Sequence, residues 1–316
     1  MKPIVPDAMA SPTNPPDFEA SLRTLSGKAR LAGALGWPVS HSLSPTLHGY
    51  WLARHGIDGA YVPLPVRPEH FDRAVRGLAL AGFAGFNVTV PHKEAALSAC
   101  DTLDDAARRI GAVNTIVVSR AAGGASDGVR LEGRNTDGFG FIENLRALAP
   151  AVLDPARAQG ACAVVIGAGG AARAVCDVLI EAGFRVALTN RTADRARSLA
   201  SRLGPAAQAV GWDERGPSLT GAALVVNTTS LGMAGQPPLE LDLALLPSDA
   251  VVADIVYVPL ETDLLKAARA RGNPVVDGLG MLLHQGRAGF HAWFGTDPVV
   301  DEPLRRFMLA ALAQRG

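Results

Sequence analysis

Lys93 stands where a lysine is electrostatically unfavourable. An apolar strand runs through Pro91 and His92 into this lysine, and the pattern predicts that a helix over 93–100 begins there. A cation at a helix N-terminus is repelled by the helix dipole, which points to a chemical demand on the ammonium group. An ammonium beside a carbonyl can stabilise negative charge on the oxygen and donate a proton. A surface lysine without a role is the alternative, and this residue alone does not decide between them.

A glycine-rich stretch is the second candidate for chemistry. It follows the apolar run 163–166, and a helical pattern continues from 173 to 182. Its residues are Gly167, Ala168, Gly169, Gly170, Ala171 and Ala172. This is the G-x-G-x-x-A form of a dinucleotide loop, in which the free N–H groups of the helix start bind the pyrophosphate. A plain glycine-rich turn is the alternative, but the strand–loop–helix context favours a dinucleotide.

The residues after the next apolar strand, 185–189, distinguish two cofactors. Enzymes that use NAD usually place Asp or Glu there to accept from the ribose 2′-hydroxyl. This chain has Asn190, Arg191 and Thr192, and Arg195 follows one helical turn later. A guanidinium pairs with a 2′-phosphate, whereas two arginines that merely solvate a helix start would oppose its dipole. The segment therefore predicts NADP(H) rather than NAD.

The composition indicates what kind of protein positions these groups. The 316 residues correspond to about two domains. Hydrophobic residues make up 48% and charged residues 19%, a mixture typical of an α/β enzyme. The 30 Lys and Arg balance the 30 Asp and Glu, so no overall field attracts nucleic acid or an anionic membrane. We expect a small-molecule substrate, no nucleic-acid or membrane partner, and either a monomer or a homodimer.

Cysteine usage and the N-terminal residues indicate location. The chain has three cysteines, an odd number without C-x-x-C spacing: Cys100, Cys162 and Cys176. This pattern indicates neither a disulfide framework nor a zinc site. We therefore expect a cytoplasmic protein. The first 27 residues contain five prolines and lack the apolar run of a signal peptide or a membrane anchor. Residues 1–27 are predicted to form a disordered leader.

The hydrophobic pattern predicts strands and helices in two successive α/β units. The first unit has strands at 31–35, 60–66, 85–90 and 115–118, and helices at 44–57, 69–81, 93–100 and 105–110. The second has a helix at 139–148 and strands at 163–166, 185–189, 224–227, 251–255 and near 274–276. Helices at 282–293 and 303–314 could pack back on the first unit. The fold class expected is an N-terminal α/β domain plus a Rossmann-type NADP-binding domain, with a cleft between them.

Seven short motifs follow one another in a fixed order. They are GWPVSHSLSP at 36–45, NVTVPHK at 87–93, GAVNT at 111–115, NTDG at 135–138, NTTSLGM at 227–233, DIVY at 254–257 and DGLGMLLHQ at 277–285. Any one of them could be coincidence. Together with the dinucleotide loop, the series resembles the shikimate dehydrogenase family from about Leu31 to the C-terminus.

The resemblance implies a reaction and a division of the chain. The reaction is the reversible NADPH-dependent reduction of 3-dehydroshikimate to shikimate, a step of aromatic amino-acid (chorismate) biosynthesis. Residues 28–136 plus 278–316 would form the substrate-binding and catalytic domain, and 137–277 the NADP-binding Rossmann domain. The leader and the glycine-rich stretch 120–130 depart from the family pattern, and neither contains a motif residue.

The resemblance also implies roles for individual residues. Lys93 and Asp137 would be the catalytic pair, with Lys93 handling the proton of the substrate C3 oxygen and Asp137 orienting the lysine. The implied substrate-binding residues are Ser42, Ser44, Thr89, Lys93, Asn114, Asp137, Tyr257 and Gln285. The implied cofactor-binding residues are Gly167, Ala168, Gly169, Gly170, Ala171, Asn190, Arg191, Thr192, Arg195, Met233, Ile255 and Gly278. Four of these residues also have a purely structural interpretation. Thr89 could be an ordinary strand residue, Asn114 and Gln285 could be amides that bond the backbone, and Tyr257 could be a half-buried ring of the core.

Two local patterns, one at Ser44 and one formed by three histidines, predict a helix start and exclude a metal site. Ser44 before Pro45 is typical of a helix N-cap with proline at the first helical position, a geometry that also suits carboxylate binding. His41, His48 and His55 recur every seven residues, but Pro45 argues against one continuous helix and no carboxylate completes a ligand set, so no metal site is expected.

Two other functions remain open at this point. A quinate/shikimate dehydrogenase would accept quinate and often NAD, and the segment 190–192 and the pair Ser42 and Ser44 argue against it. A non-catalytic paralogue that senses a metabolite would keep the fold without the reaction. The presence of both Lys93 and Asp137 and the balanced charge argue against that paralogue.

Overall fold

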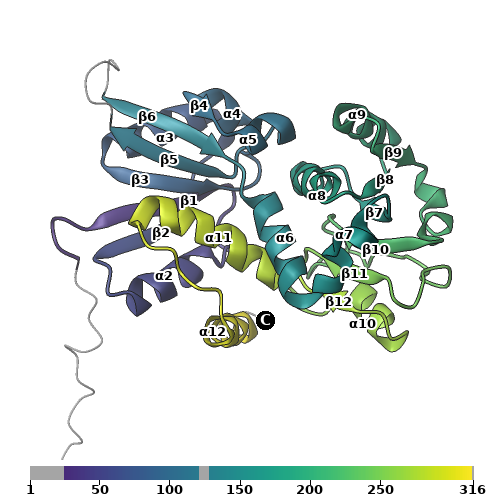
Figure 1. Ribbon diagram of the computed structural model, residues 1–316. Helices are drawn as coiled ribbons and strands as arrows, with labels where there is room; N and C mark the ends of the chain where they lie inside the picture. The colour runs from purple at the N-terminus through teal and green to yellow at the C-terminus, as the bar shows by residue number, and fades with distance from the viewer. Residues whose placement is uncertain (1–24, 121–127, 315–316) are drawn as a thin grey trace, which may run out of the picture.

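The computed structural model describes residues 25–120 and 128–314. Within these ranges the chain forms two six-stranded sheets, one in each of two lobes (Figure 1). Residues 1–24 of the predicted leader and 121–127 of the glycine-rich stretch lie outside the described residues. None of the described helices has the length and apolar character needed to cross a membrane.

The first sheet has the strand order β2-β1-β3-β5-β6-β4. Its strands are β1 (Arg30–Gly36), β2 (Gly59–Pro65), β3 (Phe83–Val88), β4 (Thr102–Leu103), β5 (Thr115–Arg120) and β6 (Val129–Arg134). β1 pairs in parallel with β2 and β3, whereas β5 runs antiparallel to both β3 and β6. The sheet is therefore mixed, and its central strands end in the segments that lead to the site.

Helices cover both faces of this sheet because side chains alternate between the faces along each strand. Ala32 and Ala34 of β1 pack in one cluster with α2 (Ser44–Arg54), α11 (Leu279–Phe294) and α12 (Glu302–Ala313). Leu35 of the same strand packs in another cluster with α3 (Phe71–Leu80), α4 (Ala95–Ala99) and α5 (Asp105–Ile110). A 3-10 turn at Pro68–His70 precedes α3. The C-terminal helices thus return to the first lobe.

The second sheet is parallel throughout its recorded pairings and has the order β12-β11-β10-β7-β8-β9. Its strands are β7 (Cys162–Ile166), β8 (Arg185–Thr189), β9 (Ala207–Val210), β10 (Ala222–Asn227), β11 (Val251–Asp254) and β12 (Val275–Val276). Val165 packs toward one face and Val164 and Ile166 toward the other. Apolar residues on both faces are typical of a parallel sheet covered on two sides by helices.

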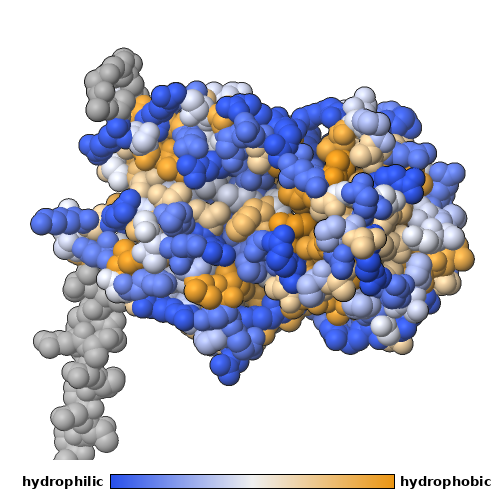
Figure 2. Space-filling view, in the orientation of Figure 1, coloured by the Kyte–Doolittle hydropathy of each residue, from blue (hydrophilic) through white to orange (hydrophobic). Residues whose placement is uncertain are grey.

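Helices and short turns complete the second lobe. The helices are α6 (Asp137–Leu148), α7 (Pro155–Ala158), α8 (Gly170–Glu181), α9 (Ala193–Leu203) and α10 (Asp263–Ala270), and the 3-10 turns are Pro150–Leu153, Trp212–Glu214 and Pro217–Leu219. α6 lies between the two lobes, next to α11 (Figure 1). Figure 2 shows mostly polar residues over the outer surface and apolar residues where the lobes meet.

The structure corrects several element predictions. The predicted helix over 93–100 begins only at Ala95, so Lys93 precedes α4 by two residues and does not lie in its first turn. Ser44 is the first residue of α2, preceded by Leu43, and its side chain does not cap the helix, so the N-cap prediction is wrong. β3 ends at Val88, two residues earlier than predicted, because the chain turns at 89–92, where the His92 N–H donates to the Thr89 carbonyl.

Candidate active site

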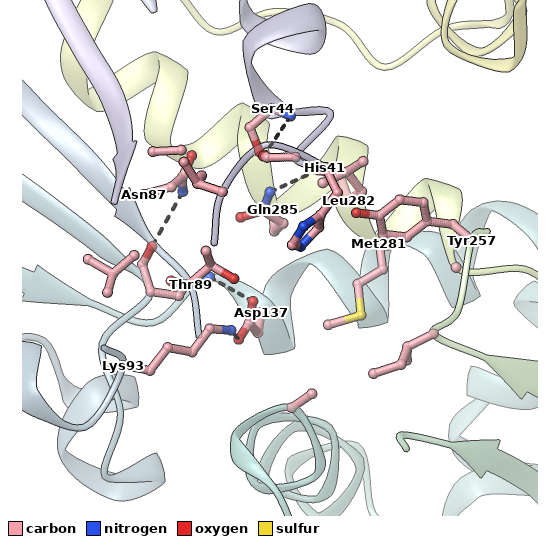
Figure 3. A pocket seen from close by; sticks show the side chains of 18 residues that line it. His41, Ser44, Asn87, Thr89, Lys93, Asp137, Tyr257, Met281, Leu282 and Gln285 are labelled. Carbon is pink, nitrogen blue, oxygen red and sulfur yellow. Dashed lines mark hydrogen bonds and ion pairs between the residues drawn. The ribbon is translucent and has the colours of Figure 1, made fainter. Parts of the chain in front are cut away.

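A cavity of about 300 Å³ opens where elements of the two lobes meet (Figure 3). All eight residues predicted to bind substrate line it: Ser42, Ser44, Thr89, Lys93, Asn114, Asp137, Tyr257 and Gln285. Three residues predicted to bind cofactor also line it: Ala171, Ile255 and Gly278. Residues that are far apart in the sequence are therefore brought around one space. The polar groups come mainly from the first lobe, whereas Ala171 and Ile255 come from the second and Gly278 directly precedes α11.

Lys93 and Asp137 form an ion pair in the wall of the cavity. Both groups are largely removed from solvent, since the Lys93 side chain is 22% exposed and that of Asp137 is 9% exposed. Asp137 is the first residue of α6, where the helix dipole stabilises a carboxylate. The ammonium thus faces the cavity beside a fixed negative charge, an arrangement that can hold a proton next to a substrate oxygen.

Asn114 fixes the other oxygen of the Asp137 carboxylate. Its side-chain amide donates to Asp137 Oδ1 at 2.7 Å and to Thr136 Oγ1 at 3.1 Å, while its own Oδ1 accepts from the Thr136 N–H at 2.8 Å. The Asp137 N–H donates to Asn135 Oδ1 at 3.1 Å. Asn114 is only 2% exposed. The carboxylate therefore has one oxygen on the lysine and one on a buried amide, so its orientation is fixed before any ligand binds.

The opposite end of the cavity carries hydroxyl and amide groups. The Ser44 N–H donates to Ser42 Oγ at 3.2 Å, which holds the two serines together at the start of α2. Asn87, which the sequence analysis gave no role, also lines the cavity, and its Oδ1 accepts from the Tyr61 hydroxyl at 2.7 Å. Burial raises the pKa of Tyr61, so the phenol stays protonated and donates. A buried asparagine inside the apolar strand β3 was the signal that could have identified this residue.

The three regularly spaced histidines occupy three different environments. His41 lines the cavity and is a second lining residue that the sequence analysis missed. His48 is buried, and its ring stacks on that of Tyr61 with centroids 4.0 Å apart; burial lowers the pKa of His48 to about 3, so it is neutral. His55 is exposed. Their seven-residue spacing therefore does not gather them, and no group of three or more potential metal-binding side chains occurs in the part of the chain described.

The loop after β11 brings Ile255 and Tyr257 to the cavity and is anchored by Asp254. Its Oδ1 accepts from the side chain of Asn227 and from the Val256 N–H, each at 3.0 Å, and its Oδ2 accepts from the Thr262 hydroxyl at 2.8 Å. Burial raises the pKa of Asp254 to about 6, although these three hydrogen bonds oppose the shift. The Asp254 carboxylate therefore holds the loop after β11 in place by accepting hydrogen bonds from three segments of the chain.

The predicted dinucleotide loop has the conformation that the glycine pattern requires. Gly167 has φ +117°, and a Cβ there would lie 2.5 Å from Thr228 Oγ1, so a larger residue is excluded by conformation and by space. Gly169 precedes α8 without a side-chain cap, and nothing lies within 4 Å of a Cβ built on it. The first N–H groups of α8 are thus accessible, and the loop fits the pyrophosphate of a dinucleotide.

The remaining predicted cofactor residues are divided between two places. Ala168, Gly169, Gly170 and Arg195 line a second cavity, of about 400 Å³, between the start of α8 and α9. Asn190 bonds the Thr192 carbonyl at 2.9 Å and so shapes the turn before α9. Arg191 is exposed and does not line either cavity. Met233 is 40% exposed in the loop after β10 and also lies outside both linings.

Comparison with known proteins gives matches to both lobes. Residues 34–116 match the family model for the shikimate dehydrogenase substrate binding domain, and residues 148–232 match that for shikimate / quinate 5-dehydrogenase. The chain is 60% identical over 287 residues to a shikimate dehydrogenase (NADP(+)) of Paramagnetospirillum magneticum, a match that covers 90% of this chain and all of the relative.

Solved structures show the same similarity. Shikimate 5-dehydrogenase from Thermus thermophilus in complex with NADP(H) and shikimate is 36% identical with a TM-score of 0.75, covering 90% of this chain and 99% of that one. Quinate dehydrogenase from Corynebacterium glutamicum in complex with NAD is 29% identical with a TM-score of 0.79, covering 89% of this chain and 99% of that one.

Proposed function

Because the chain belongs to the shikimate dehydrogenase family, we propose that it catalyses the reversible NADPH-dependent reduction of 3-dehydroshikimate to shikimate, a step of chorismate and aromatic amino-acid biosynthesis. The observation that carries this proposal is the Lys93–Asp137 pair in a cavity that is also lined by Ala171, Ile255 and Gly278. A substrate carbonyl can lie against the ammonium while its carbon faces the predicted nicotinamide side.

Lys93 and Asp137 are proposed as the catalytic pair. NADPH, when bound, supplies the hydride that adds to C3 of the substrate. Negative charge then develops on the C3 oxygen, and the Lys93 ammonium stabilises this charge and donates the proton that completes the hydroxyl. Asp137 keeps the ammonium oriented through their ion pair, and Asn114 keeps the carboxylate in place. In the reverse direction, the lysine accepts the proton of the C3 hydroxyl.

The other polar residues of the cavity are proposed to bind the substrate. Ser42 and Ser44 suit the carboxylate because they lie at the N-terminal end of α2, where the helix dipole stabilises an anion. The ring hydroxyls then fall within the part of the cavity lined by Thr89, Asn114 and Gln285. Tyr257 comes from the second lobe and would complete the substrate site when the lobes close. Asn87 and His41 are added to this set because they line the same space.

The proposed cofactor is NADP(H), held by the loop from Gly167 to Ala171 and by the start of α9. The free N–H groups of α8 would bind the pyrophosphate, and Arg195 would pair with the 2′-phosphate. Ile255 and Gly278 would contact the nicotinamide, and Met233 could join them if its loop moves. Asn190, Arg191 and Thr192 are proposed to form the turn beside the adenosine ribose, from which the exposed Arg191 guanidinium would also pair with the 2′-phosphate.

Domain division, location and assembly are also proposals. We assign 28–136 plus 278–316 to substrate binding and 137–277 to NADP binding, which is supported by the return of α11 and α12 to the first sheet. A cytoplasmic location is supported by the three cysteines, which are all free thiols. We retain monomer or homodimer as the expected assembly, with shikimate and 3-dehydroshikimate as small-molecule partners.

The test is a set of four steady-state assays with purified protein. Shikimate or quinate is combined with NADP+ or NAD+, and formation of reduced nicotinamide is followed by absorbance. We expect turnover of shikimate with NADP+ to exceed every other combination. Preferential turnover of quinate with NAD+ would instead assign the chain to the quinate-using branch of the family. Tight shikimate binding by calorimetry, with no turnover in any combination, would make it a metabolite-binding paralogue.

A further inference from the structure

The second cavity, between α8 and α9, holds more positive charge than the predicted cofactor residues account for. Besides Arg195 and the dinucleotide loop, it is lined by Arg173 and Arg202. Arg195 and the loop are the two groups proposed to hold the phosphates of the cofactor. A cation that shares one cavity with both of them is placed to act on the same ligand.

Two carboxylates also line this cavity, and each already has an arginine. Glu94 pairs with Arg173 at 3.1 Å, across the boundary between the lobes. Asp194 pairs with Arg197 within α9. Among the residues that the structure describes, neither Arg195 nor Arg202 forms an ion pair with a carboxylate. These two arginines therefore carry the uncompensated charge of the cavity.

Arg202 lies on the same face of α9 as Arg195. The two are separated by seven residues, two helical turns or about 10 Å along the axis, with Ser198 between them on the cavity side. Long helical side chains lean toward the helix N-terminus, so a conformation that directs the Arg202 guanidinium toward Arg195 is available to it. The two guanidinium groups can therefore approach one anion from the same side.

The contact that Arg202 makes in the structure is one that a ligand could replace. Its Nη2 donates to the carbonyl of Ile110, the last residue of α5, at 3.4 Å, which is long for a hydrogen bond. Arg202 itself is exposed. A charge-assisted bond to a phosphate oxygen is stronger than a long bond to a neutral carbonyl. Arg202 can thus turn toward an anion at little cost to the fold.

We propose that Arg202 is a specificity-determining residue that, together with Arg195, binds the 2′-phosphate of NADP(H). The proposal rests on the proposed function for the identity of the cofactor. It places a second guanidinium beside that of Arg195 in a cavity that Arg191 does not line. Selectivity for NADP(H) over NAD(H) would then depend on a residue two turns inside the helix.

The test is equilibrium binding of NADPH and NADH to the full chain, followed by the change in nicotinamide fluorescence. In Arg202→Met, which keeps the aliphatic stem, we expect the Kd for NADPH to rise about tenfold, corresponding to the loss of one charge-assisted contact. The Kd for NADH should stay within about twofold of the wild-type value. Arg202→Lys should recover part of the NADPH affinity. Arg269→Met is the matched control, because Arg269 is an exposed arginine of α10 in the same lobe.

Each other outcome would overturn the proposal. Equal weakening of NADPH and NADH would place Arg202 on the pyrophosphate instead, and unchanged binding of both would remove it from the cofactor site. A loss of shikimate affinity alone would show that Arg202 acts only through its bond to Ile110. Because the assay measures binding, it can succeed even if the wild-type protein does not oxidise shikimate, so failure of the proposed function is distinguishable.

Discussion

Replacing Lys93 by methionine removes the ammonium while keeping most of the side-chain volume. The Asp137 carboxylate then loses its ion pair, but it keeps the Asn114 amide at 2.7 Å and the favourable end of α6. The carboxylate should therefore remain in place, but the fold should lose about 1–3 kcal/mol, because a largely buried carboxylate is left without its cation. This variant separates the chemistry of the lysine from its structural role.

The expected effect on turnover follows from the loss of the proton donor. A positioned acid or base contributes about 10²- to 10⁴-fold, so kcat for shikimate oxidation should fall about 10³-fold, or about 4 kcal/mol in activation free energy. Binding should change far less, because Ser42, Ser44 and Gln285 still line the cavity. We expect the Kd for shikimate, measured by calorimetry, to rise less than about tenfold.

The assay compares kcat and KM for shikimate with NADP+ in the wild type, Lys93→Met and Lys266→Met. Lys266 is an exposed lysine of α10, 59% exposed at its side chain, and provides the matched control. Thermal unfolding of all three proteins shows whether the fold is intact. A kcat for Lys93→Met within about threefold of wild type, in a protein that is still folded at the assay temperature, would refute the assignment of the lysine as proton donor.

Three further predictions test other parts of the structure. Burial raises the pKa of Asp254 to about 6, so the folded state binds the proton more tightly than the unfolded state does. The free energy of unfolding should therefore fall by up to about 3 kcal/mol as pH rises from about 4 to 6. Urea titrations of Asp254→Asn should lack this pH-dependent component. Gly280→Ala would place a Cβ 1.8 Å from a side-chain oxygen of α6, so we expect urea unfolding to show a loss of about 1–3 kcal/mol in the free energy of unfolding. Gly49→Ala is the control, because nothing lies close to the added Cβ, and it should leave the stability unchanged or raise it. The Arg109 guanidinium of the first lobe donates to the Asp177 carboxylate of the second at 3.0 Å. A double-mutant cycle with Arg109→Met and Asp177→Asn should give a coupling free energy of about 0.5–1 kcal/mol. A coupling near zero would show that this partly exposed ion pair does not hold the lobes together.

Strong local patterns allowed much of the fold to be predicted from the sequence. The strands β7 and β10 are continuous apolar runs followed by motif residues, so their positions were predicted within one or two residues. The strand β6 was missed because it follows a glycine-rich stretch, and β9 was missed because it is a short edge strand without a clear apolar run. Pairing with a neighbouring strand, rather than local propensity, establishes both.

The site residues divide in a similar way. Lys93 and Asp137 were identified because they belong to motifs, and the structure places them in contact. Tyr61 and His48 carry no such signal, since the stacking of their rings depends on the approach of β2 to α2. Arg202 was also not identified, because only the packing of α9 beside α8 shows which face of the helix lines a cavity. Contacts between elements distant in the sequence leave little trace in local pattern.

The segment between α5 and β5 connects the proposed chemistry to the cofactor lobe. Asn114 holds the Asp137 carboxylate, and the backbone N–H of the residue before it donates to the Lys93 carbonyl at 2.9 Å. Three residues earlier in the chain than Asn114, the carbonyl of Gly111 accepts from Arg173 of α8 at 3.4 Å. Because α8 is the helix that follows the dinucleotide loop, a displacement of its first turns on cofactor binding would act directly on the segment that positions both members of the catalytic pair. The same few residues thus join the lobes and set the geometry of the proton donor.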